Sequence, residues 1–416
     1  MLTTLGMVGL LVAVFVGFNI GGSSTGVAFG PAVGSRLLRK VTAGVLFTGF
    51  AFLGAWVLGR EVIETMSNGI VPAVQFSPVA SVGVLFFTGL SLLISNLYGV
   101  PASTSMTAVG AIVGLGLATN SLNEALMFTI ISAWIVAPLI AFAIGAIIGR
   151  YAYPYLDRKI AFTRLQTHLL QLDRSGRIPT LRFNENANAR DLLGSLLVVV
   201  IGCYMAFSAG ASNAANAVAP LVGQGGPITV NQGVVLAAVA FGLGSLTIAR
   251  RTLETVGDDI TELPILAALI VSIVGGTLIT ALSALGIPAS LAVSTTCCII
   301  GLGWGRASRT VTAVALAKPS PKPNPDLDVS TGALTTPAAK GAPASPTVGD
   351  LADAEPPQET PADGKPAVPQ IGEEDPADLD TRSLFDADAA KRIVVMWLLT
   401  PSIAVLGSYP LFLLVL

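Results

Sequence analysis

The sequence is poor in charged residues, histidine and cysteine, and each shortage excludes a class of protein. Only 12% of its 416 residues are Asp, Glu, Lys or Arg, against about 25% in an ordinary soluble domain. The single histidine, His168, lies in a charged loop, so chemistry that pairs histidine with carboxylates is not expected. Cys203, Cys297 and Cys298 lie in apolar stretches, which favours buried side chains over disulfides or zinc ligands. We therefore expect an integral membrane protein that is not an enzyme and holds no metal or cofactor.

Apolar runs of about 20 residues, the length with which a helix crosses the hydrocarbon of a bilayer, recur along the chain. The first 18 residues are apolar and no Lys or Arg precedes Arg36, so we interpret them as a retained span rather than a cleaved signal peptide. The sequence thus predicts an all-α polytopic membrane protein with about 10–12 membrane segments. The clearest further runs are Val41–Gly59, Ser81–Tyr98, Leu126–Gly149, Val234–Ala249, Ile265–Leu285 and Ile393–Leu416.

Two polar segments interrupt the apolar runs. Residues 150–190 are rich in arginine, as expected of a basic cytoplasmic loop. Residues 319–387 are rich in Pro, Ala, Asp and Glu and have almost no aromatic residues, a composition typical of a disordered linker. The predicted division is therefore a first transmembrane repeat (1–149), the basic loop (150–190), a second repeat (191–318), the acidic linker (319–387) and a C-terminal transmembrane helix (388–416).

The positions of the basic residues predict the membrane topology. Lys and Arg in short loops stay on the cytoplasmic side. With the N- and C-termini outside, residues 150–190 and 319–387 are cytoplasmic and Arg60 is the basic residue that falls outside. We expect a multi-pass protein of the plasma membrane in this orientation.

Two stretches of small and polar residues resemble each other. Phe18–Gly34 reads F-N-I-G-G-S-S-T-G-V-A-F-G-P-A-V-G, and Phe207–Gly223 reads F-S-A-G-A-S-N-A-A-N-A-V-A-P-L-V-G. A helix that only faces lipid does not need such polar side chains, because polar groups at bilayer depth must find partners or line a cavity. A function at membrane depth is indicated.

Two further pairs of segments follow in the same order. Arg60–Pro72 resembles Arg251–Pro264, and Gly99–Gly114 resembles Gly286–Gly301. With a cytoplasmic loop between the halves, the repeats have opposite orientation in the membrane. Two inverted-topology repeats with broken or re-entrant helices are the signature of a secondary transporter, whose site lies at the repeat interface near the midplane.

Glycine, proline and hydroxyl residues in these motifs predict where helices break. The predicted helix-break residues are Gly21, Gly22, Gly210, Pro101 and Pro288, each followed by residues suited to cap the next half-helix. Four helix N-termini that converge would form an anion site. The alternative is that the small residues only let helices pack closely.

The second polar stretch resembles the signature of the inorganic phosphate transporter (PiT) family, H-G-A-N-D-V-A-N-A-V-G-P, and P-A-S-T-S resembles its P-x-S-T-T-H. The resemblance implies an inverted-repeat transporter, often a homodimer, that moves a tetrahedral oxyanion with a cation. Asn213 and Ser24 stand where the signature has Asp, and Met106 and Val293 stand where it has His. The runs N-I-G-G-S-S (19–24), S-A-G-A-S-N (208–213) and G-V-P-A-S-T-S (99–105) are most similar to the sulfate permease branch of the family, which lacks these acids.

The missing carboxylates favour sulfate over phosphate. Phosphate near neutral pH carries a proton that a carboxylate can accept, whereas sulfate has only acceptors and a carboxylate repels it. Backbone N–H groups and neutral polar side chains would bind sulfate without a fixed negative charge. The candidate substrate-binding side chains are those of Ser23, Ser24, Ser103, Thr104, Ser212, Asn213 and Ser290.

Proton coupling is favoured over sodium coupling, because sodium sites in such carriers commonly need carboxylate or carbonyl oxygens. Glu64 and Glu254 occupy matching positions in the two halves and are the coupling candidates; a helix-cap or interfacial role is the alternative.

The leading hypothesis is a sulfate and proton symporter that works by alternating access. A phosphate symporter coupled to protons or sodium, a non-transporting scaffold or receptor, and an anion channel are the alternatives. The expected partners are the oxyanion, protons and the lipid bilayer, with no nucleic acid.

Overall fold

The computed structural model describes residues 4–35, 37–97, 103–160, 170–173, 180–183, 189–223, 226–247, 265–309 and 387–415. The elements of the first part are α1 (Thr4–Gly34), α2 (Lys40–Val57), α3 (Gly59–Glu64), the π-helix η1 (Thr65–Gly69), the 3-10 helix η2 (Ala73–Gln75), α4 (Pro78–Leu97), α5 (Thr104–Ala118), α6 (Glu124–Ile147), the π-helix η3 (Ile148–Ala152) and α7 (Tyr153–Ile160). They are followed by β1 (Leu170–Asp173), β2 (Thr180–Phe183), α8 (Ala189–Val222), α9 (Val230–Thr247), α11 (Ile265–Ala284), α12 (Leu291–Ala307) and α15 (Ala387–Val415).

The predicted all-α membrane architecture is confirmed. Within the described residues, seven helices are long and apolar enough to cross a membrane, and three shorter apolar helices accompany them. The long ones include the continuous helix Glu124–Asp157, which joins α6, η3 and the start of α7. The shorter ones are Pro78–Ile94, Thr104–Ala118 and Leu291–Ala307.

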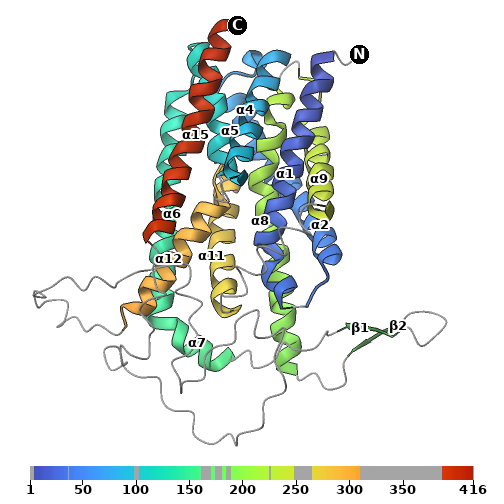
Figure 1. Ribbon diagram of the computed structural model, residues 1–416, viewed down its shortest axis with the longest axis vertical. Coiled ribbons are helices and arrows are strands. Elements are labelled where there is room, and N and C mark those ends of the chain that lie inside the picture. Colours follow the sequence, from blue (N-terminus) through green and yellow to red (C-terminus); the bar gives the residue numbers. More distant parts are fainter. Residues whose placement is uncertain are drawn as a thin grey trace, which may run out of the picture.

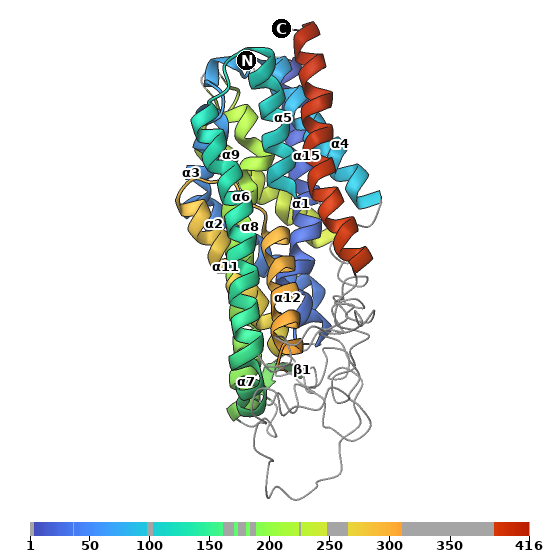
Figure 2. The same ribbon diagram turned by 90° about the vertical axis from the view of Figure 1, so that its left-hand side faces the viewer.

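The short helices occupy opposite halves of the bundle. Figure 1 shows α4 and α5 in its upper half and α11 and α12 in its lower half, while α8 runs through the whole bundle between them. Figure 2 shows from another side that α5 lies above α12. The two ends of the chain lie at the same end of the bundle, and α7 lies at the other (Figure 1). α5 and α12 therefore both begin inside the bundle, and α5 lies in its upper half whereas α12 lies in its lower half.

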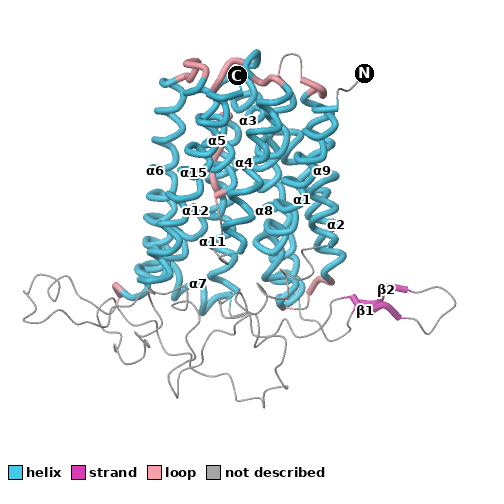
Figure 3. The backbone as a smooth tube through the Cα atoms, turned by 45° about the horizontal axis from the view of Figure 1, so that its top comes forward, coloured by secondary structure: helices cyan, strands magenta, loops and turns pink. Residues whose placement is uncertain are grey.

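The strands form one small antiparallel hairpin within the predicted basic loop. β1 pairs with β2 so that Leu170 lies opposite Phe183 and Asp173 opposite Thr180. Figure 3 shows this hairpin beside the helical bundle rather than inside it. It contributes nothing to the packing around the centre of the bundle.

Glycines set the distance between the most closely packed helices. Gly210 of α8 lies against the Ala51 carbonyl of α2, so that a Cβ atom added at Gly210 would overlap this oxygen. Gly54 of α2 stands in the same relation to the Phe207 carbonyl of α8. Such small-residue contacts let helix backbones touch, which is how membrane helices gain packing energy.

Three other helix pairs are built in the same way. Close backbone approaches occur between α1 and α9 at Gly21 and Gly244, between α6 and α12 at Gly145 and Gly301, and between α5 and α15 at Gly110 and Gly114. Each of these glycines lies against a carbonyl or a side chain of the partner helix. The small residues therefore decide which helices form pairs.

The helix breaks predicted at Gly21, Gly22 and Gly210 are wrong. α1 and α8 run unbroken through these positions. Gly21 instead admits the Phe241 backbone of α9, and Gly210 admits the Ala51 backbone of α2. Their lack of a side chain serves helix packing rather than helix termination, the alternative that the sequence left open.

The break predicted at Pro288 is present. α11 ends at Ala284, Gly286 adopts a φ of 69°, and α12 begins at Leu291. A positive φ suits glycine because it has no Cβ, and proline cannot donate a backbone hydrogen bond to a preceding helix. Pro101, the matching residue of the first half, lies outside the described residues.

Substitution of Gly210 by Ala should destabilise the bundle, whereas the same change at Gly49 should not. The new methyl group at Gly210 would meet Ala51 backbone, which cannot move aside, whereas a Cβ at Gly49 has nothing within 4 Å. Overpacking costs about 1–3 kcal/mol, and Ala is favoured over Gly in a helix by about 1 kcal/mol. Thermal unfolding in detergent should show a lower melting temperature for G210A alone; equal melting of G210A and G49A would contradict the packing account.

Candidate functional site

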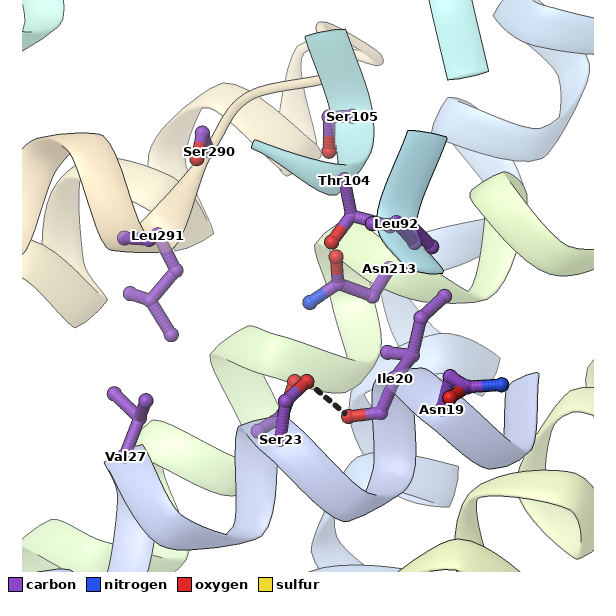
Figure 4. Close-up of a pocket in the computed structure, with 12 residues that line it drawn as sticks. Asn19, Ile20, Ser23, Val27, Leu92, Thr104, Ser105, Asn213, Ser290 and Leu291 are labelled. Atoms are coloured by element: carbon purple, nitrogen blue, oxygen red, sulfur yellow. Dashed lines mark hydrogen bonds between the residues drawn. The ribbon is translucent and has the colours of Figure 1, made fainter. Parts of the chain in front are cut away.

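A cavity of about 100 Å³ lies where the starts of α5 and α12 approach α1, α4 and α8 (Figure 4). A single water needs about 10–15 Å³ of such space, so the cavity has room for several waters or an ion of similar size. None of the described residues that line it carries a charge. The lining residues are Asn19, Ile20, Ser23, Ser24, Val27, Leu92, Thr104, Ser105, Asn213, Ser290, Leu291 and Ala292.

The structure brings most of the predicted binding residues together at this cavity. Ser23, Ser24, Thr104, Asn213 and Ser290 line it, and they come from both halves of the chain. The buried Ser103 and Ser212 do not line the cavity. The predicted helix-break residues Gly21, Gly22, Gly210 and Pro288 do not line it either, and Pro101 lies outside the described residues.

The two coupling candidates are not part of the cavity. Glu64 is the last residue of α3, and its side chain is exposed. It does not line the cavity. Glu254 lies outside the described residues.

α5 and α12 each begin with a serine cap. The Ser103 hydroxyl oxygen accepts a hydrogen bond from the Met106 N–H at 3.3 Å, and the Ser290 hydroxyl oxygen accepts one from the Val293 N–H at 3.4 Å. A cap satisfies one of the N–H groups of a first turn and leaves those before it without an acceptor in their own helix. These are the N–H groups of Thr104 and Ser105 in α5.

The matching N–H groups of α12 belong to Leu291 and Ala292. All four residues that carry these groups line the cavity. The positive ends of two helix dipoles add to the effect of the N–H groups. The cavity therefore offers anion-binding donors from two helices that begin in opposite halves of the bundle.

Hydrogen bonds connect α8, α5 and the segment before α12. Asn216 Nδ2 donates to Ser105 Oγ and to Asn213 Oδ1, at 3.1 Å each. The hydroxyls of Ser105 and Ser212 both donate to the Ala289 carbonyl, at 2.9 and 2.6 Å. The Ala289 carbonyl, which lies between α11 and α12, thereby accepts hydrogen bonds from both α5 and α8.

This network also orients the Asn213 side chain. Its Oδ1 is engaged by Asn216, so its Nδ2 is the end left for a ligand. Figure 4 shows this nitrogen turned toward the space between Ser23 and Leu291. Asn213 therefore presents a hydrogen-bond donor, not an acceptor, to the cavity.

The α1 side of the cavity is its open side. The Ser23 side chain is exposed and Val27 is 38% exposed. Ser23 Oγ donates to the Ile20 carbonyl of its own helix at 3.2 Å, as Figure 4 shows, and Asn19 Nδ2 donates to the Phe15 carbonyl at 2.8 Å. Both bonds stay within α1, so in the part of the chain that the structure describes neither side chain is tied to another helix of the lining.

Sequence reasoning missed Ser105, Asn216 and Asn19. Ser105 lies within P-A-S-T-S, and Asn216 follows Asn213 by three residues, the spacing that places two side chains on one face of a helix. That spacing was the available signal for Asn216. Asn19 directly precedes the I-G-G-S-S run, but nothing in the sequence distinguishes its side chain from a lipid-facing one.

The residues of the site suit an anion better than a metal ion. In the part of the chain that the structure describes, no group of three or more His, Cys, Asp or Glu side chains is close enough to hold a metal. The cavity instead combines backbone N–H groups, an amide N–H and hydroxyls, all of which donate hydrogen bonds. An anion that brings only acceptors matches this set.

Known proteins resemble this chain over most of its length. The model of a family described as the phosphate transporter family matches residues 20–408. Sulfate permease CysP from Bacillus subtilis (strain 168) is 32% identical over 298 residues, which cover 71% of this chain and 77% of that protein.

A solved structure titled "The sodium-dependent phosphate transporter" matches this chain with a TM-score of 0.65 and covers 99% of both chains. The sequence identity is 17%, so this likeness shows the fold alone. The family match extends over most of the chain, including both hydrophobic halves and α15. The chain therefore belongs to the phosphate transporter family, as the resemblance of its second polar stretch to the family signature indicated.

Proposed function

We propose that this chain is a secondary active transporter that imports sulfate across the plasma membrane by proton symport with alternating access. The observation that carries the proposal is the uncharged cavity, to which two helix N-termini and the Asn213 amide present donors. Such a site stabilises a dianion by hydrogen bonds and helix dipoles alone. The proposed ligand groups are the side chains of Ser23, Ser24, Thr104, Asn213 and Ser290 with the N–H groups at the starts of α5 and α12.

Ser103 and Ser212 are proposed to act indirectly. Ser103 caps α5, and Ser212 holds the Ala289 carbonyl that precedes α12. Both side chains are almost fully buried. Their effect on substrate is through the position of the two helix starts.

The chemistry of the lining favours sulfate. Hydrogen phosphate keeps a proton near neutral pH and is best bound where a carboxylate accepts it, but none of the lining residues that the structure describes is acidic. Sulfate needs only donors. The similarity to a protein named as a sulfate permease supports the same choice.

Phosphate is the second candidate substrate. The matching family is described by phosphate, and the solved structure that shares the fold is titled as a sodium-dependent phosphate transporter. Serine hydroxyls in the cavity are able to accept the proton of hydrogen phosphate in place of a carboxylate. Sulfate and phosphate are therefore alternative substrates for the same cavity.

Alternating access is proposed to rest on two inverted repeats. The close pair α1 and α9 has a counterpart in α8 and α2, and the pair α6 and α12 has one in α15 and α5. A pseudo-twofold axis that relates the halves would produce this exchange of partners. The proposed orientation places both termini outside and residues 150–190 and 319–387 in the cytoplasm.

Sulfate uptake into proteoliposomes should exceed phosphate uptake, and excess sulfate should inhibit both. The physical reason is that both anions would occupy one cavity whose donors suit sulfate better. The measurement is initial uptake of each labelled anion with the other as competitor. Phosphate uptake that excess sulfate leaves unchanged would count against sulfate as the substrate.

Substitution of Asn213 by Asp should shift selectivity from sulfate to phosphate. The new carboxylate would still accept from Asn216 but would turn an anionic oxygen toward the cavity. Two charges about 4 Å apart near a protein surface interact by about 4 kcal/mol, so sulfate uptake should fall by at least about tenfold.

The matched control is Asn68→Asp. Asn68 is exposed and its Oδ1 accepts from the Ala73 N–H at 3.2 Å, a bond that a carboxylate also makes. N68D adds the same charge away from the cavity and should transport sulfate as the wild type does. Sulfate uptake by N213D at the wild-type rate would contradict the proposal that sulfate binds next to the Asn213 side chain.

The proposed proton coupling assigns proton transfer to Glu64 and Glu254. Their replacement by Gln should reduce the stimulation of sulfate uptake by an inward proton gradient, because an amide neither takes up nor releases a proton in this pH range. Glu124→Gln is the control, since Glu124 is an exposed residue in the first turn of α6. Uptake that does not respond when the wild-type gradient is collapsed would remove proton coupling from the proposal.

A further inference from the structure

A repeated tryptophan and proline motif lies in the two helices that pack on α12 and α5. Residues 134–141 of α6 read W-I-V-A-P-L-I-A, and residues 397–404 of α15 read W-L-L-T-P-S-I-A. Trp, Pro, Ile and Ala recur at the same positions. α6 packs against α12 and α15 packs against α5, so the two motifs occupy corresponding places in the bundle.

Trp134 is bound to the segment that precedes α12. Its Nε1 donates to the Pro288 carbonyl at 2.7 Å, across 154 residues of sequence. Pro288 is two residues before Ser290, the cap of α12. The Trp134 indole is therefore tied to the start of the helix whose first two residues line the cavity.

The next carbonyl along the chain is held as well. Ala289 accepts from Ser105 and Ser212, so two successive carbonyls before α12 are held from α6, α5 and α8. This segment has no helical hydrogen bonds of its own to define it. Its conformation, and with it the direction of the α12 N-terminus, depends on these outside donors.

Trp397 is the counterpart that makes no such bond. Its Nε1 is buried and has no hydrogen-bond partner in the part of the chain that the structure describes. The residue that matches Pro288 in the first half is Pro101, which lies outside the described residues. The two tryptophans thus share a motif, but among the described residues only Trp134 has a hydrogen-bond acceptor for its indole nitrogen.

We propose that Trp134 is a positioning residue of the oxyanion site, which holds the N-terminal turn of α12 against the cavity through the Pro288 carbonyl. The inference rests on the proposed function, since it concerns the same cavity. Loss of the indole N–H frees the Pro288 carbonyl and lets the start of α12 move. The N–H groups of Leu291 and Ala292 then point at the substrate less well, which weakens binding without changing any residue that touches it.

The test compares Trp134→Phe with Trp397→Phe in the full chain. Both changes remove the same ring volume from the same motif, but of the hydrogen bonds between described residues only W134F removes one. Uptake of labelled sulfate into proteoliposomes gives the half-saturating concentration and the maximal rate, and melting in detergent gives the stability. One net hydrogen bond corresponds to about a two- to tenfold change in equilibrium, and W134F should raise the half-saturating concentration by this factor.

W397F should leave the half-saturating concentration at the wild-type value, although both variants melt lower. Trp134→His retains a ring N–H and should bind sulfate more tightly than W134F. Equal half-saturation in W134F and W397F would overturn the positioning role, as would a W134F effect confined to melting. If W134F does not assemble, Trp134→Leu and Trp397→Leu take the places of the two Phe variants, because leucine also lacks the ring N–H, and the same comparison of half-saturating concentrations decides.

The wild type separates this inference from the proposed function. A wild type that carries phosphate and not sulfate refutes the sulfate assignment, and the same series with labelled phosphate then tests Trp134. A wild type that carries neither anion overturns both proposals. A wild type that carries sulfate, with W134F and W397F alike, overturns the positioning role alone.

Discussion

α5 and α12 begin inside the bundle, and each leaves backbone N–H groups there that its own helix cannot satisfy. In a medium that excludes water, such groups must find an acceptor or face a cavity. Ser103 and Ser290 each satisfy one N–H group, and the residues that carry the preceding N–H groups line the cavity between the two helix starts. The cavity and its preference for acceptors follow from this one constraint.

The helix starts keep their places because the surrounding helices approach closely. Glycines at the contacts of α8 with α2 and of α1 with α9 bring these backbones together and leave α1 and α8 unbroken beside the cavity. α8 then reaches both interior helices with Ser212, Asn213 and Asn216. Packing by small residues and hydrogen bonding by polar ones are separate contributions of the same polar stretches.

The described residues that line the cavity carry no charge, which has a chemical consequence. A neutral site binds an anion by donors that are already oriented, so it does not need a counter-charge that would itself require a partner inside the membrane. Asn213 illustrates the point, because its oxygen is engaged by Asn216 and its nitrogen faces the cavity. An aspartate at this position would present an acceptor and alter the kind of anion that fits.

The sequence by itself determined the membrane class, the family and the candidate residues, because apolar run length and the doubled motifs are local properties of the chain. It predicted the break at Pro288 correctly, since proline acts on adjacent backbone. Ser103 and Ser290, which it gave as substrate ligands, cap α5 and α12 in the structure. Only the tertiary structure decided that Gly21 and Gly210 are packing contacts, that Ser105 and Asn216 belong to the site, and that Trp134 anchors Pro288. Each of these depends on a partner more than 100 residues away or on a neighbouring helix, and the order of residues along one segment does not specify which helix that is.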